Sequence, residues 1–407
     1  MRIMEHEGHQ VSPGAFAAWR PEVVYAVLLA VFGLAFAMVL PPGQAPDEFQ
    51  HFFRAYHVSE GHFWLTPRES GWGGADLPEE VPAAIPGPFN GVPFHADRKV
   101  QRSDFAGLHD SLRHPDQRRI IDLPNTSAYG SVPYVPQALG IALGRTLGLG
   151  PLAMTYAGRL GNLALAVVML FLVIRITPKF KHVFGAVALL PLSVQQFSSN
   201  SPDASQFAAV LLLIALLLRQ ATESARRIGV GEVLSLLAVG AWLGACKPPY
   251  VMLALLYLAI PPSRYGSLKR YLRVGVFLFA ATFATAAFWV HAVGDSVPKS
   301  HNLLSYPCVP GDQARGILEH PLHFVLVLLR TIDVYGAHWI NQAGALGWGE
   351  THAHPLVTYA SLVFLVILAL IDRSESGPIP RRFRAVGMLA TVLGSVLVLT
   401  SMYLWWS

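Results

Sequence analysis

Apolar segments long enough to cross a bilayer recur along the whole chain. The first, Val23 to Leu40, contains no charged residue and is followed directly by Pro41 and Pro42. A helix of about 20 apolar residues spans the hydrocarbon core of a membrane. The later apolar segments are Tyr156–Ile174, His182–Phe197, Ala204–Leu218, Val230–Ala245, Tyr250–Ile260, Val274–Val293, Leu356–Ile371 and Ala385–Trp405. The pattern predicts an all-α membrane protein, a polytopic bundle of about nine transmembrane helices.

The basic residues predict how this bundle is oriented. About half of the 30 Lys and Arg residues lie on one side of the predicted membrane, with Arg2 and Arg20 ahead of the first segment. The others of this group lie in short loops: Arg175, Lys179, Lys181, Arg219, Arg226, Arg227, Arg264, Lys269, Arg270, Arg273, Arg373, Arg381, Arg382 and Arg384. The positive-inside rule makes this side cytoplasmic. We expect a bacterial cytoplasmic (inner) membrane protein, with a cytoplasmic tail at residues 1–21, one membrane domain at residues 22–407 and an external C-terminus.

Two apolar stretches must not cross the membrane if this orientation holds. Residues 133–149 include Pro136 and Arg145, and residues 322–335 include Arg330 and Asp333. We interpret both as amphipathic helices on the outer surface. A re-entrant or tilted pair of crossings is the alternative. The first outer loop then covers residues 41–155, and its length and aromatic content favour a functional role.

The composition agrees with a membrane protein and excludes several classes. Hydrophobic residues make up 53% of the chain, charged residues 14%, and the mean hydropathy is +0.43. These values are not those of a soluble domain. The net charge of +5 does not indicate nucleic-acid binding, because the basic residues lie in short loops between apolar segments. The chain has no phosphate-binding Walker loop, dinucleotide fingerprint, nucleophile elbow or zinc pattern, which argues against nucleotide or flavin chemistry.

Two adjacent carboxylates, Asp47 and Glu48, follow the first apolar segment within a few residues. His51 and Arg54 come next. Carboxylates close to the membrane are costly unless they bind a ligand or do chemistry. We therefore interpret Asp47 and Glu48 as catalytic, with Asp47 as a general base or a metal ligand. The alternative is that Asp47 only caps a helix at residues 48–60.

A second polar segment, residues 195–203, forms a short outer loop after the third apolar segment. It contains six amide or hydroxyl side chains, including Gln196 and Asn200, and ends at Asp203. We expect these three residues to bind substrate. Asp203 also has the sequence position of a cap for the following helix, and the two interpretations are compatible.

Two further outer segments carry candidate binding residues. Lys247 and Tyr250 lie at the outer end of the fifth apolar segment, where a lysine is rare and a lipid phosphate would bind it. A lysine whose ammonium group reaches the membrane surface is the alternative. Trp348 and Glu350 lie in a glycine-rich loop and suit the binding of a sugar ring, although tryptophan is also enriched at membrane interfaces.

Several short motifs, in order over nearly the whole chain, resemble the GT-C fold of integral-membrane glycosyltransferases, which use polyprenyl-phosphate sugars. The closest resemblance is to an uncharacterised bacterial family of predicted membrane proteins in that clan. The matching segments are Pro46-Asp47-Glu48, Arg54-Ala55-Tyr56, Ser59-Glu60-Gly61, Tyr134 to Gly140, Gly158 to Asn162, Gln195-Gln196, Ser201 to Ala204, Lys247 to Tyr250 and Gly347-Trp348.

The resemblance implies roles for individual residues. Asp47 matches the acidic residue of the first outer loop that deprotonates the acceptor or binds a metal, with Glu48 beside it. Asp203 matches a second acidic residue, so a divalent cation (Mg or Mn) would be held by Asp47 and Asp203. Lys247, or Arg159, matches the basic residue near the donor phosphate. Relatives continue beyond a segment like Tyr403 to Trp406, so we expect a fragment or a shortened member ending at Ser407.

The sequence therefore predicts an inverting glycosyltransferase acting on the extracytoplasmic face. Its partners would be membrane lipids, a polyprenyl-phosphate sugar donor, and a glycan, lipid or protein acceptor, with no nucleic acid. The predicted substrate-binding residues are His51, Arg54, Arg159, Gln196, Asn200, Asp203, Lys247, Tyr250, Trp348 and Glu350. Two alternatives are a transporter or flippase of lipid-linked glycans and a non-catalytic subunit of cell-envelope polysaccharide assembly. A transporter would require polar residues deep inside the spans, whereas here they cluster at the outer ends.

Overall fold

The computed structural model describes residues 20–85, 89, 91–95, 97–106, 111–223, 227–300, 308–372 and 379–406. Most of the predicted tail and the residues Arg2, Arg226, Arg373 and Ser407 lie outside these ranges. The helices are α1 (Pro21–Val39), α2 (Glu48–Ser59), α3 (Glu80–Ala84), α5 (Arg102–Ala106), α6 (Val135–Thr146), α7 (Pro151–Ile176), α8 (Lys181–Ala188), α9 (Pro191–Phe197), α10 (Asp203–Thr222), α11 (Val230–Cys246), α12 (Leu268–Ala292), α13 (Pro310–Glu319), α14 (Pro321–Gln342), α15 (Pro355–Ile371) and α16 (Arg381–Trp406). The 3-10 helices are η2 (Val132–Tyr134), η3 (Pro248–Ala259), η4 (Pro262–Tyr265) and η5 (Gly294–Ser296), and the strands are β1 (Thr66–Pro67), β2 (Gly73–Pro78), β3 (Arg118–Asp122), β4 (Ala345–Leu346) and β5 (Thr351–His352).

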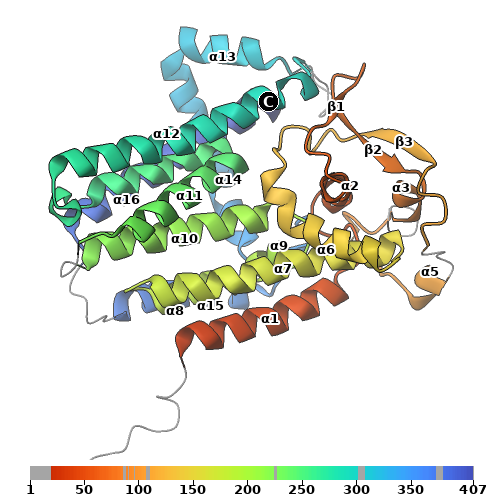
Figure 1. Ribbon diagram of the computed structural model, residues 1–407, viewed down its shortest axis with the longest axis horizontal. Coiled ribbons are helices and arrows are strands. Elements are labelled where there is room, and N and C mark those ends of the chain that lie inside the picture. The colour runs from red at the N-terminus through yellow and green to blue at the C-terminus, as the bar shows by residue number, and fades with distance from the viewer. Residues whose placement is uncertain are drawn as a thin grey trace, which may run out of the picture.

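The long apolar helices lie side by side in a bundle, as the sequence predicts for a membrane protein (Figure 1). Five described helices are long and apolar enough to cross a membrane: α1, α7, α10, α12 and α16. Three apolar helices are shorter: α11, η3 and α15. The prediction of a helical membrane bundle is confirmed at this level, whereas the count of about nine spans is not.

Proline explains two of the differences from the predicted spans. The predicted span His182–Phe197 is divided into α8 and α9, because Pro191 at the start of α9 has no backbone N–H with which to continue the preceding helix. The predicted span Tyr250–Ile260 is the 12-residue 3-10 helix η3, which begins with Pro248 and Pro249. At roughly 2.0 Å per residue η3 is about 24 Å long, shorter than a hydrocarbon core.

The predicted first outer loop is folded into a cap at one end of the bundle. The antiparallel strands β1, β2 and β3 form a three-stranded sheet in that order, with Gly74 of β2 opposite Asp122 of β3. Helices α2 and α6 pack beside this sheet around a second hydrophobic core that includes Phe52, Leu77 and Ile141. The cap is placed against α7 because the chain leaves α6 and enters α7 after only four residues.

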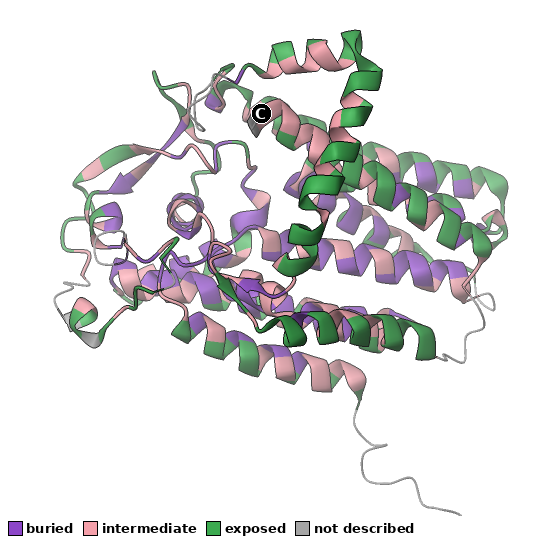
Figure 2. Ribbon diagram, turned by 180° about the vertical axis from the view of Figure 1, so that it is seen from behind, coloured by how far each residue is buried: buried purple, intermediate pink, exposed green. Residues whose placement is uncertain are grey.

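The two stretches predicted to lie on the surface differ in structure. Residues 133–149 form η2 and α6, and the 12 residues of α6 extend only about 18 Å, too short to cross a bilayer. Helix α6 packs closely on α7, where a Cβ at Gly140 would lie 2.1 Å from the Ala157 carbonyl oxygen. Residues 322–335 belong to the 22-residue α14, in which no described residue is buried; Figure 2 shows it exposed and lying across the bundle. Its surface position in a membrane stays a prediction.

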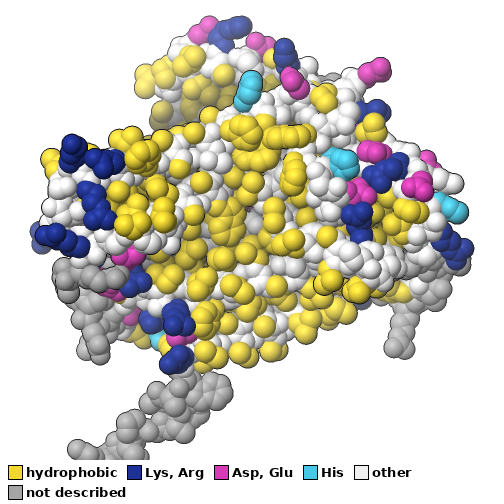
Figure 3. All heavy atoms as spheres, viewed as in Figure 1, with side chains coloured by type: hydrophobic (Ala, Val, Ile, Leu, Met, Phe, Trp, Pro, Cys, Tyr) yellow, Lys and Arg dark blue, Asp and Glu magenta, His cyan; other side chains and the backbone are white. Residues whose placement is uncertain are grey.

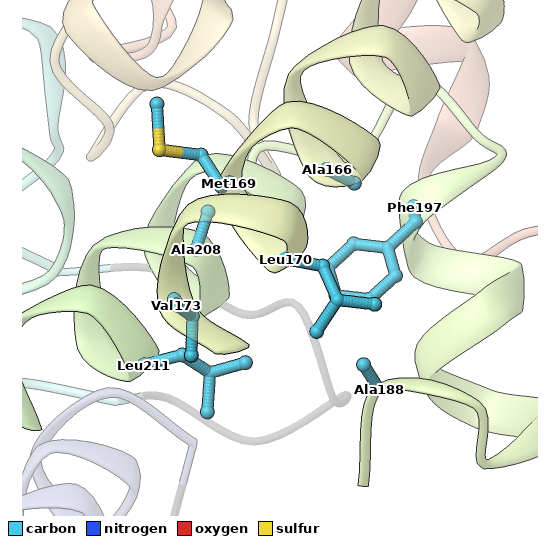
Figure 4. A pocket seen from close by; sticks show the side chains of 8 residues that line it. All are labelled: Ala166, Met169, Leu170, Val173, Ala188, Phe197, Ala208 and Leu211. Atoms are coloured by element: carbon cyan, nitrogen blue, oxygen red, sulfur yellow. The ribbon is translucent and has the colours of Figure 1, made fainter. Parts of the chain in front are cut away.

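The bundle core is apolar and closely packed. Helices α7 and α10 supply much of it, including Leu170 and Leu213. One small void of about 10 Å³ lies between α7, α8, α9 and α10 and is lined by apolar side chains such as Met169 and Phe197 (Figure 4). This volume is about that of one water-sized probe, and no polar group lines it, so it is a packing defect and not a ligand site.

Charged residues gather at the two ends of the bundle and leave an apolar band between them (Figure 3). Lys and Arg side chains cluster at the end where α12 begins and α7 ends. Acidic, basic and histidine side chains are mixed at the opposite end, around the cap. This distribution is that of a bundle whose apolar band lies in lipid.

Candidate functional site

Asp47 is held in an unusual backbone conformation at the start of α2. Its φ of 55° lies in the left-handed region, which aspartate tolerates better than most residues. It occupies the N-cap position, but its side chain makes no capping hydrogen bond. Instead, the Asn125 amide donates to Asp47 Oδ1 at 2.5 Å. The capping interpretation therefore does not account for this carboxylate.

Glu48 has an entirely different environment from its neighbour. It forms a buried ion pair with Arg159 of α7, in which Arg159 Nη2 lies 2.6 Å from Glu48 Oε2 and Nε lies 2.7 Å from Oε1. The backbone N–H groups of Gly43 and Asn200 also donate to Glu48, at 2.9 and 3.1 Å. Both side chains are only 1% exposed. All of the accepting positions on Glu48 are occupied, which argues against its predicted role in catalysis.

Arg159 is engaged as completely as Glu48. Besides the ion pair, its guanidinium donates to the backbone carbonyls of Ala37, Leu40 and Pro41, where α1 ends and the chain turns towards α2. The guanidinium N–H groups thus give hydrogen-bond donors to carbonyls that a helix end leaves without partners. Arg159 therefore joins α7, the end of α1 and the start of α2, and this geometry does not fit its predicted contact with a donor phosphate.

Asp203 and Lys247 form an ion pair next to this turn. Lys247 Nζ lies 2.5 Å from Asp203 Oδ1 and 5.3 Å from the centre of the Tyr129 ring. Asp203 is the first residue of α10, and Lys247 follows the last residue of α11. Burial lowers the pKa of Lys247, but the Asp203 carboxylate, together with Tyr129 and Tyr250, outweighs burial and holds that pKa above its usual value. Lys247 is therefore a charged ammonium group.

Aromatic residues of the cap connect the two acidic residues. His51 Nδ1 lies 2.9 Å from the Tyr134 hydroxyl, and the His51 ring contacts Tyr129 edge-on. The charges of Asp47 and Asp203 both act on Tyr129 and Tyr134. The structure thus brings together residues from α2, the segment before α6, α10 and the end of α11. We call Asp47, His51, Tyr129, Tyr134, Asp203 and Lys247 the acidic-aromatic cluster.

Burial sets the protonation of this cluster. It raises the pKa of Asp47, an effect that the Asn125 hydrogen bond only partly opposes. Burial lowers the pKa of His51 to about 4, so this imidazole is neutral at pH 7. A carboxylate whose pKa is raised is a stronger base than an exposed one. Asp47 is therefore a stronger base than an exposed aspartate, which suits it to accept a proton.

The buried histidine predicts a pH dependence of stability. The unfolded chain binds a proton at His51 near pH 6.5, whereas the folded protein binds it only near pH 4. The free energy of unfolding should therefore fall as the pH is lowered from about 6.5 to about 4. His51→Gln should reduce this fall, measured as the denaturant midpoint at pH 7 and pH 5, while His352→Gln at an exposed position should not. An unchanged pH dependence in His51→Gln would refute this assignment.

Arg54 is a buried cation with no carboxylate partner among the described residues. It is 1% exposed and contacts His57 Nδ1 at 3.1 Å, the Phe63 carbonyl at 2.9 Å and the Ser131 hydroxyl at 2.8 Å. Burial lowers its pKa to about 10, so it stays charged at pH 7. Its charge acts on the Tyr134 hydroxyl. Arg54 therefore places next to the acidic-aromatic cluster a positive charge that no described carboxylate pairs with.

The predicted glycine-rich loop is hydrogen-bonded to α9 and to the turn between α1 and α2. Gln195 donates to the Gly347 carbonyl at 3.1 Å and accepts from the Gly347 N–H at 2.8 Å. Trp348 Nε1 donates to the Gly43 carbonyl at 3.1 Å. Glu350 accepts a hydrogen bond from the Gln44 amide. Trp348 also packs on Phe94 and is half-buried, so its role in binding a sugar stays a prediction.

The remaining predicted binding residues lie around this site. Asn200 is buried and donates to the Thr155 carbonyl at 3.1 Å. Gln196 is half-buried. Tyr250 is exposed, and it lies close enough to Lys247 to affect the pKa of that lysine. Sequence reasoning assigned no role to Asn125 and Tyr129. Their only signal was a run of polar and aromatic residues just before α6, within a loop already expected to be functional.

The donor groups do not favour a metal at this site. Among the described ranges, no group of three His, Cys, Asp or Glu residues is arranged to hold an ion. The Lys247 ammonium group occupies the position at Asp203 that a divalent cation would need, and the Asn125 amide donates to Asp47. A cation bridging Asp47 and Asp203 would have to compete with the Lys247 ammonium group for Asp203 and would bind Asp47 next to the Asn125 amide.

Comparison with known proteins identifies one matching family. Its model, described as a predicted membrane protein (DUF2142), matches residues 29–407. No curated protein and no solved structure matches the chain. The matched residues include the cap, every member of the acidic-aromatic cluster and the bundle from the middle of α1 onwards.

Proposed function

We propose that this chain, which belongs to the DUF2142 family of predicted membrane proteins, transfers a sugar from a polyprenyl-phosphate donor to a glycan, lipid or protein acceptor. One observation carries the proposal: the half-buried carboxylate Asp47 lies in the same cluster as the charged pair Lys247 and Asp203, at one end of an apolar bundle. A base and a phosphate-binding cation at a membrane surface are what this reaction requires. Membership of the GT-C clan is part of the proposal.

Asp47 is the proposed general base. Only Oδ1 receives a hydrogen bond from a described residue, the Asn125 amide, so Oδ2 is free to accept a proton. The acceptor hydroxyl oxygen attacks the anomeric carbon and its proton moves to Asp47. The new carbon–oxygen bond forms as the bond from the anomeric carbon to the phosphate oxygen breaks. The electron pair stays with the leaving phosphate, and the configuration at the anomeric carbon is inverted.

Lys247 is the proposed partner of the leaving phosphate. Its ammonium group must then exchange the Asp203 carboxylate for a phosphate oxygen. The positive charge of Lys247 stays paired through this change of partner. His51 is neutral at pH 7 and can donate a hydrogen bond without adding charge. Arg54 supplies a second positive charge, which acts on the Tyr134 hydroxyl of the same cluster. No metal is needed to neutralise the phosphate in this scheme.

The distribution of charge supports an orientation in which the site faces outwards. Basic side chains gather at the end of the bundle opposite the cap (Figure 3). Under the positive-inside rule that end is cytoplasmic, so the acidic-aromatic cluster lies on the extracytoplasmic side. We place the donor, whose lipid tail lies in the membrane, beside the outer ends of α10 and α11, from which Asp203 and Lys247 come.

The test is transfer of labelled sugar from a polyprenyl-phosphate donor by the purified protein in lipid. Lys247→Ala should raise the dissociation constant of the donor by about 10- to 100-fold, because a charge-assisted contact to phosphate is lost. The matched control is Lys299→Ala, an exposed lysine after α12, which should leave binding unchanged. If wild-type protein moves lipid-linked sugar between leaflets without transferring it, the transporter alternative holds and our proposal fails.

A further inference from the structure

A basic cavity lies at the end of the bundle opposite the acidic-aromatic cluster. Its volume is about 480 Å³. Its walls come from the last turn of α7, the first residue of α8 and the end of α10, with Arg175, Lys181 and Arg219 as the cations. The proposed sugar transfer uses none of these residues. Figure 3 shows basic side chains gathered at this end of the molecule.

The charges lining this cavity are unbalanced. Among the described residues that line the cavity, Glu223 is the only acidic one, and it already accepts a hydrogen bond from Arg219 Nε at 3.1 Å. Within the described ranges, neither Arg175 nor Lys181 forms an ion pair. Like charges around one hollow repel each other unless an anion lies between them. Three basic side chains and one paired carboxylate therefore form a site that favours a negatively charged ligand.

The size and position of the cavity narrow the choice of anion. About 480 Å³ falls within the range of small-molecule sites and far exceeds the space of one water. Arg175 and Arg219 are in the last turns of two helices that are long and apolar enough to cross a membrane. The cavity is therefore at the depth of lipid headgroups. Leu172 and Ile176 of α7 form its apolar side.

We propose that this cavity binds a phosphate group carrying a negative charge, with Arg175 and Lys181 as its main contacts. The phosphate comes either from the headgroup of an anionic lipid or from a soluble phosphate compound. Arginine and lysine both suit phosphate, arginine through paired hydrogen bonds and lysine as a point charge. Basic hollows between membrane helices are typical binding places for anionic headgroups. This inference does not depend on the proposed sugar transfer.

A matched pair of double variants separates this site from the general basic character of this end. Arg175→Gln with Lys181→Gln removes two cations of the cavity. Lys269→Gln with Arg273→Gln removes two exposed cations near the start of α12, which do not line the cavity. Both variants change the net charge equally. Arg175→Lys with Lys181→Arg preserves the charge and shows whether the site tolerates exchanged side chains.

The experiment measures retention of phosphatidylglycerol by the full-length protein in lipid nanodiscs of phosphatidylcholine, using native mass spectrometry. One basic residue near an anionic surface contributes roughly fivefold in affinity, so the cavity variant should bind phosphatidylglycerol about 25-fold more weakly than wild type. The control variant and the charge-preserving variant should stay close to wild type. A parallel titration of the detergent-solubilised protein with inorganic phosphate identifies the source of the phosphate.

The outcomes are distinct. Loss of lipid binding in the cavity variant alone supports a headgroup site. Loss of inorganic phosphate binding in that variant alone supports a site for a soluble phosphate compound. Equal losses in the cavity and control variants would show that only general surface charge attracts lipid, and the proposal would be overturned. Wild-type binding in the cavity variant would overturn it as well.

Discussion

Asp47→Asn should lower the rate of sugar transfer by about 10²–10⁴-fold, the usual loss when a general base is removed. Asparagine keeps the shape of the side chain and can still accept the hydrogen bond from Asn125, but it cannot take up the acceptor proton. The dissociation constant of the donor should change little, because Asp47 makes no contact that donor binding alone requires. Single-turnover transfer of label at saturating donor measures the chemical step directly.

The control for this variant is Asp122→Asn in β3. Asp122 is another carboxylate of the cap, and it pairs with Arg68 at 3.2 Å on the surface. Asp122→Asn removes one negative charge, as Asp47→Asn does, but at a position of the cap outside the acidic-aromatic cluster. Transfer by Asp122→Asn should equal that of wild type. If folded Asp47→Asn transferred sugar as fast as wild type, Asp47 could not be the base.

Glu48→Gln should lower the free energy of unfolding by about 3–5 kcal/mol, the usual result of leaving one member of a buried ion pair without its partner. Arg159 would keep its charge at a position that is 1% exposed. Its remaining partners, the carbonyls at the end of α1, are neutral and do not balance that charge. Chemical denaturation of the purified protein, followed by tryptophan fluorescence, gives the loss.

A double-mutant cycle distinguishes the ion pair from general damage. Glu48→Gln with Arg159→Gln should cost clearly less than the sum of the two single changes, because no isolated charge is left buried. The exposed pair of Arg68 and Asp122 provides the comparison: Asp122→Asn should cost at most about 1 kcal/mol. Additive costs for Glu48 and Arg159 would mean that their pairing contributes little, and our account of the turn would be wrong.

The sequence alone was enough to predict the membrane bundle, and it also pointed to segments that form the candidate site. Uninterrupted apolar runs such as that of α1 need no tertiary information, because a bilayer requires only length and apolar character. The sequence also shows that Asp47, Asp203 and Lys247 lie beside the ends of apolar segments. The three belong to segments far apart in the chain, and the structure places them in one cluster.

Only the tertiary structure distinguished the two adjacent carboxylates. In sequence Asp47 and Glu48 look equivalent. In the structure Asp47 accepts from Asn125, whereas Glu48 pairs with Arg159, which is more than 100 positions away in the chain. The strands of the cap were not predicted, because β1 has two residues and β2 contains two glycines and a proline. Burial and pairing depend on long-range contacts, and a local pattern does not contain them.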